Sequence, residues 1–173
     1  MDRKFIEVSV AKSWYYAAPT WWNYAGGLMQ LFQIKALSEA SCRFYRVAMQ
    51  QVDDYNIRRI FQQRFEIYQQ LLNLTASQQA QPNAPTDERL TQAVKWFEAA
   101  QSSIDNFDNL IFLDFLDAHE NVALDALKQG VKESNDDYMS ANLAQCAASL
   151  QVNHDALISL KAQYRNQQPF SPV

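Results

Sequence analysis

Apolar side chains recur at steps of three and four residues along four long stretches, and this spacing constrains the fold more than any other feature. The stretches are 28–51, 53–74, about 105–131 and about 136–166. Because an α-helix turns once in about 3.6 residues, this spacing places the apolar side chains on one face of a helix. Only three glycines and five prolines occur in 173 residues, which disfavours a turn-rich β fold. The sequence therefore predicts an all-α protein.

The four stretches form two pairs, separated by the polar break TASQQAQPNAPTDE at 75–88. Thr86 is a candidate N-cap for a shorter helix over 87–101, with Leu90 and Phe97 on its apolar face. Two hairpins of long helices with a longer crossover between them form a four-helix bundle. We therefore predict three regions: an aromatic N-terminal extension at 1–27, a bundle with a short crossover helix at 28–166, and a tail at 167–173.

Charge and composition argue against several classes of partner. The net charge is −4, whereas nucleic-acid binding needs a basic face. Residues 1–75 carry nine Lys/Arg and six Asp/Glu, and residues 76–173 carry six and thirteen. This asymmetry either helps the hairpins pack or reflects solvated helix faces. No apolar run reaches 18 residues, so no membrane span is expected.

The two cysteines, Cys42 and Cys146, do not form a CxxC pair. A reducing, cytoplasmic location is therefore the default expectation. Both cysteines fall on predicted inward faces of helices, so we expect slowly reacting thiols.

An uncharged, aromatic stretch of 22 residues lies between Lys12 and Lys35: SWYYAAPTWWNYAGGLMQLFQI. Pro19 and the Gly26–Gly27 pair exclude one continuous helix. Three placements are open: a cap over the bundle, an interface with a second copy, and docking on a membrane surface, for which a basic face is lacking. Because the apolar faces of the predicted helices already fill the core, we expect this aromatic segment to form an interface in a homo-oligomer. Its residues would be Trp14, Trp21, Trp22 and Tyr24.

One carboxylate, Glu120, interrupts the apolar stripe of FLDAHENVALDAL at 115–127. Asp117 shares this stripe, and His154 falls inside the stripe of the last predicted helix. A buried carboxylate needs a partner, a proton or a metal ion to offset its lost hydration. Two interpretations are open. In the first, a metal such as iron or manganese is bound by Glu120, His154 and Asp117. In the second, a structural hydrogen bond joins Glu120 and His154.

A complete di-metal carboxylate site needs a Glu from each of two helices and Glu-x-x-His from each of the other two. Here QVNH has Gln151 in place of the glutamate, which favours the structural hydrogen bond. The inward Arg64 is expected to pair with Asp117 or Glu120. His119 is turned about 100° from Glu120 and is expected to be exposed. No phosphate-loop, dinucleotide, zinc-protease or nucleophile motif occurs, so no catalytic residue is predicted.

Four segments in a fixed order resemble a bacterial ferritin-like family of unknown function. They are ALSEASCRFYRVAMQQVDDYNIRRIFQQRFEIYQQLL, AVKWFEAA, FLDAHENVALDAL and VNHDALISLK. The resemblance covers roughly residues 28–162; Glu120 and His154 match the family's pattern, whereas Ser41 stands where an acidic residue is common. It implies a ferritin-like bundle but no activity.

The sequence is therefore compatible with two functions. The first is a non-enzymatic interaction or structural protein that forms homo-oligomers. The alternative is a metal-binding carboxylate bundle with a degenerate site and oxidase or storage chemistry.

Overall fold

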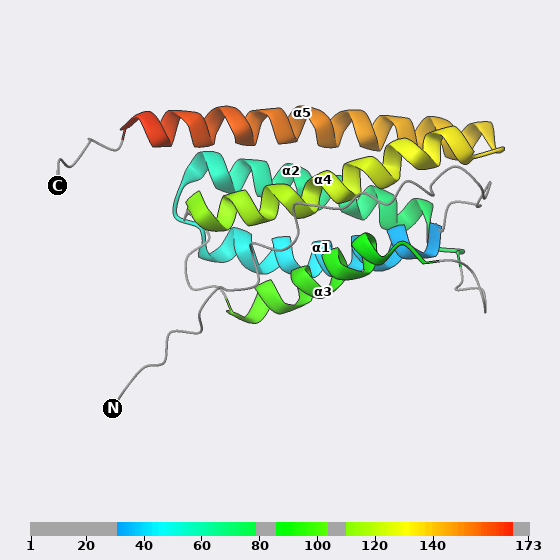
Figure 1. The fold of residues 1–173 in the computed structure, drawn as a ribbon, viewed down its shortest axis with the longest axis horizontal. Helices are drawn as coiled ribbons and strands as arrows, with labels where there is room; N and C mark the ends of the chain where they lie inside the picture. The colour runs from blue at the N-terminus through cyan, green and yellow to red at the C-terminus, as the bar shows by residue number, and fades with distance from the viewer. Residues whose placement is uncertain (1–30, 79–85, 104–109, 168–173) are drawn as a thin grey trace.

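Five α-helices make up the described part of the chain (Figure 1). The computed structural model describes residues 31–78, 86–103 and 110–167. The helices are α1 (Leu31–Gln51), α2 (Tyr55–Leu74), α3 (Glu88–Ser103), α4 (Leu110–Glu133) and α5 (Asp137–Gln167). No strand occurs in these ranges, which confirms the all-α prediction. The predicted aromatic extension, with Trp14, Trp21, Trp22 and Tyr24, lies outside the described residues, as does the predicted helix start near 105.

The helices pack as two antiparallel hairpins, α1–α2 and α4–α5, with α2 against α5 and α3 along α1 and α4 (Figure 1). Hydrogen bonds from α1 to the start of α3 and from Arg43 to Glu98 show that α1 and α3 run in the same direction. Since α2 and α4 both run antiparallel to α5, they are parallel to each other. The connection between them therefore has to return along the bundle, and α3 makes this crossover as predicted.

Aspartate side chains cap the starts of three helices. Asp54 accepts hydrogen bonds from the backbone N–H groups of Asn56 and Ile57 at the start of α2. Asp136 does the same for α5, and Asp87 accepts from the backbone N–H of Arg89, two residues along, at the start of α3. Such caps satisfy N–H groups that lack a partner within the helix. The prediction that Thr86 caps the crossover helix was wrong, because the adjacent aspartate takes that position.

Phe44 lies at the centre of the core, where four of the helices meet. Its ring contacts the rings of Phe61, Phe97 and Phe112, at centroid distances of 6.3, 5.4 and 6.1 Å. These residues belong to α2, α3 and α4, and all four rings are buried. The crossover helix is therefore part of the hydrophobic core.

Both cysteines are buried and free, as the stripe positions predicted. Burial raises the pKa of the Cys42 and Cys146 thiols to about 11. Because the thiolate is the reactive species, we expect Ellman's reagent at pH 8 to label both thiols about 100-fold or more slowly than a free cysteine. In urea, where the chain is unfolded, both thiols should react rapidly and consume two equivalents of the reagent. Fast labelling of either cysteine in the folded protein would contradict the buried placement.

Candidate functional site

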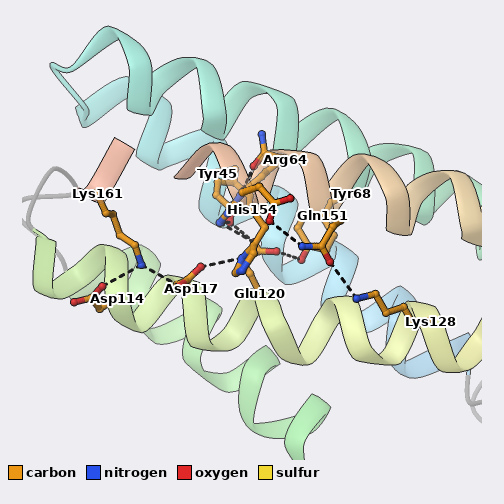
Figure 2. A network of polar contacts seen from close by, with 12 residues as sticks. Tyr45, Arg64, Tyr68, Asp114, Asp117, Glu120, Lys128, Gln151, His154 and Lys161 are labelled. Atoms are coloured by element: carbon orange, nitrogen blue, oxygen red, sulfur yellow. Dashed lines mark hydrogen bonds and ion pairs between the residues drawn. The ribbon is translucent and has the colours of Figure 1, made fainter. Parts of the chain in front are cut away.

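Glu120 is the centre of a polar network inside the bundle (Figure 2). Its side chain, on α4, is only 1% exposed. Tyr45 on α1 donates a short hydrogen bond to Oε1, and Tyr68 on α2 donates to Oε2 at 2.7 Å. Arg64 Nη1 lies 3.7 Å from Oε1. Two hydroxyl donors and one guanidinium thus face the two oxygens of this buried carboxyl group.

Arg64 connects the same network to the last helix. Its guanidinium is fully buried, and Nε donates to Asn153 Oδ1 on α5 at 2.5 Å. Nη1 donates to the Tyr45 hydroxyl at 3.3 Å. The amide nitrogen of Asn153 donates to the Ile60 carbonyl and to Gln63, which fixes the orientation of its side chain. One charged pair thus joins side chains from α1, α2, α4 and α5.

The electrostatic surroundings favour this charge distribution. Burial, and then the negative charge of Glu120, raise the pKa of the Tyr45 and Tyr68 hydroxyls well above its ordinary value. Burial alone would lower the pKa of Arg64, but Tyr45 and Glu120 beside it raise that pKa above its usual range. The tyrosines therefore stay neutral donors and Arg64 stays charged at any ordinary pH.

A second cluster joins α4 to α5 nearer the surface (Figure 2). Lys161, whose side chain is 7% exposed, lies 2.9 Å from Asp117 Oδ2 and 3.0 Å from Asp114 Oδ1. His154 Nδ1 lies 2.9 Å from Asp117 Oδ1, within ion-pair distance but outside hydrogen-bond geometry. Arg165 contacts the other oxygen of Asp114 at 2.8 Å. Each of these two aspartates is therefore next to a protein cation.

The three predicted metal ligands fall into different contacts. Glu120 and His154 are buried and Asp117 is half-buried, as their stripe positions predicted. The predicted hydrogen bond between Glu120 and His154 was wrong, because His154 faces Asp117 and Glu120 faces two tyrosines and Arg64. The predicted pairing of Arg64 with Glu120 is confirmed. Within the described ranges, no three His, Cys, Asp or Glu side chains converge on one metal-sized position.

His119 was predicted to be exposed, and this was wrong. Its ring stacks on Trp96 of α3, with centroids 4.4 Å apart, and it is partly buried. Phe112, also on α4, stacks on the same indole, with ring centroids 5.9 Å apart. His119, about 100° around the helix from Glu120, therefore faces the crossover helix. The helix period of α4 alone does not reveal that α3 packs on this side.

Burial lowers the pKa of His119 from 6.5 to about 4. The unfolded chain then binds a proton that the folded chain does not bind between these values, so stability falls as the pH drops from about 6.5 to 4. Allowing for its partial exposure, we expect a loss of about 1–2 kcal/mol from this group. Urea unfolding at pH 4.5 and 7 should show that His119→Gln removes this part of the loss. An NMR titration of His119 with a midpoint near 6.5 would contradict it.

Four functional side chains were not assigned a role from the sequence: Tyr45, Tyr68, Asn153 and Lys161. Tyr68 lies one turn after Arg64 on the same stripe, and Lys161 lies two turns after His154. That spacing places each beside a charged residue on a shared helix face. Which of these side chains meet Glu120 depends on the axial offset between the packed helices. The helix period of each segment does not reveal that offset.

Comparison with protein-family models, with curated proteins and with solved structures finds no match to this chain. None of the helices in the described ranges is long and apolar enough to cross a membrane. The contacts of the described residues therefore carry the functional conclusion.

Proposed function

We propose that this chain is a ferritin-like four-helix bundle that acts through its surface, as a non-enzymatic interaction or structural protein that forms homo-oligomers. One observation carries the proposal. Each of the two inward carboxylates, one in the Glu120 network and one in the second cluster, faces a cation that the protein itself supplies: Arg64 for Glu120 and Lys161 for Asp117. The interior charges are thus used to hold the helices together.

The positions of these cations argue against a divalent metal at the same place. A metal bound at Glu120 would lie next to the buried guanidinium of Arg64, and two like charges in a low-dielectric interior repel strongly. The two oxygens of Glu120 also accept hydrogen bonds from Tyr45 and Tyr68. Metal binding would require these donors to move away, together with Arg64.

The helix arrangement supports the ferritin-like part of the proposal. Two antiparallel hairpins joined by one long crossover, with the second and third long helices parallel, form the topology of ferritin-like bundles. Here α3 lies in that crossover and packs against α1 and α4. The short helix therefore fits this topology without disturbing the order of the long helices.

One observation favours the metal-binding alternative. His154 turns Nδ1 towards Asp117, the arrangement by which a carboxylate often orients a metal-binding imidazole. In that case the opposite nitrogen of His154 would bind iron or manganese. Lys161 competes for the same aspartate at 2.9 Å, and for this reason we place the metal function second.

Two measurements test the proposal. Metal analysis of protein purified without chelator should find far less than one equivalent of iron or manganese, and near-stoichiometric metal would favour the alternative. Light scattering at tens of micromolar should find a homo-oligomer, and deletion of residues 1–26 should yield a smaller species, because that deletion removes the predicted interface residues. A full-length monomer would overturn the oligomer part of the proposal.

A further inference from the structure

A cavity of about 380 Å³ lies at the end of the bundle where α4 turns into α5. It lies beside the first residue of α1, since Leu31 is part of its wall. The remaining lining comes from the turn that follows α2, and from the α4–α5 connection with the helix ends beside it. These residues are Gln78, Gly130, Glu133, Ser134, Asn135, Asp136 and Met139.

The lining combines apolar surface with acceptors. Leu31 and Met139 supply apolar side chains, and Gly130 presents backbone without a side chain. Glu133 and Asp136 bring carboxylates, and Asp136 uses Oδ1 for the α5 cap. A flat, apolar ring with a hydroxyl donor at one edge matches this chemistry, and tyrosine is the side chain of that description.

The chain that precedes α1 carries such a ring within reach. Tyr24 lies seven residues before Leu31, a stretch that spans at most about 25 Å when extended. Gly26 and Gly27 lie between them and allow the chain to reverse direction. Because both partners belong to one chain, the local concentration of the ring is on the order of millimolar, above that of any second copy in dilute solution.

We infer that the cavity is the docking site for the Tyr24 ring of the same chain, which anchors the aromatic segment at the α4–α5 end of the bundle. The inference goes beyond the proposed function, because it takes Tyr24 out of the predicted interface and assigns this one ring to its own bundle. Trp14, Trp21 and Trp22 are then left to contact a second copy.

Disulfide trapping in the full chain tests the docking. Ala25→Cys beside the docked ring and Asn135→Cys on the rim of the cavity form the reporter pair, while the two native cysteines are buried. Mild oxidation should produce an intramolecular disulfide. Adding Tyr24→Ala should slow its formation at least fivefold, because the anchor is lost. Tyr16→Ala, a change of the same type in the same segment, should leave the rate unchanged.

The outcomes separate this inference from the proposed oligomer. An equal rate with and without Tyr24 would overturn the docking, as would failure of the pair to form a disulfide. A disulfide-linked dimer would place the segment on a second copy, which overturns own-chain docking but agrees with the homo-oligomer. Light scattering of the unmodified chain decides the oligomeric state independently of the disulfide result.

Discussion

Replacing Arg64 with methionine is expected to lower the free energy of unfolding by about 3–5 kcal/mol. The substitution leaves the Glu120 carboxylate buried at 1% exposure without its cation. Two tyrosine hydroxyls still donate to it, but a hydrogen bond from a neutral donor does not replace the opposite charge. Asn153 also loses the donor that its carbonyl oxygen accepts from.

Urea unfolding of the parent and variant measures this loss, with two controls. Arg43→Met removes an exposed pair with Glu98, so it should cost less than about 1 kcal/mol. Arg64→Met combined with Glu120→Gln removes both charges, so it should be more stable than Arg64→Met alone. If Arg64→Met costs no more than Arg43→Met, the buried pair does not hold the helices together.

Much of the fold was predictable because it follows from local properties of the sequence. These are the helical spacing of apolar residues and the polar composition of the segments between helices. Phe44, Arg64 and Leu113 fall on stripes read directly from the sequence, and all three are fully buried. The capping aspartates were predictable for α2 and α5, where the polar residue precedes a periodic stretch. At α3 the cap was predicted at Thr86, whereas Asp87 takes this position and its backbone N–H also donates to Gln33 of α1.

The candidate site was predictable in its members but not in its pairs. Glu120, His154 and Arg64 are recognisable as ionisable residues on apolar faces. Which of them meet depends on the axial offset between helices, and a shift of one turn, about 5.4 Å, exchanges partners. This is why His154 meets Asp117 rather than Glu120. His119 was misplaced for a related reason, since the crossover helix covers a face that a four-helix arrangement leaves open.

Replacing Lys161 with methionine is expected to lower the free energy of unfolding by about 2–3 kcal/mol at pH 7, slightly less than loss of the central pair. The ammonium group is nearly buried and contacts both Asp114 and Asp117. Asp114 keeps Arg165, whereas Asp117 keeps only the nearby His154 ring among the described residues. The methionine stem retains most of the apolar packing of the lysine, so the loss reports the charge.

The effect should depend on pH with a defined sign. Burial of Asp114 opposes ionisation, but Lys161 and Arg165 together hold its pKa below the ordinary 3.8. The stability from this group is therefore complete above about pH 3.8 and is lost as the pH falls through the lower folded value. The gap between parent and Lys161→Met should shrink at pH 2–3. Lys128→Met removes an exposed lysine that contacts only the neutral Gln151 among the described residues, so it should show little loss at either pH. A gap of equal size at pH 7 and pH 2 would mean that lost packing, and not the aspartate pairs, accounts for the effect of Lys161.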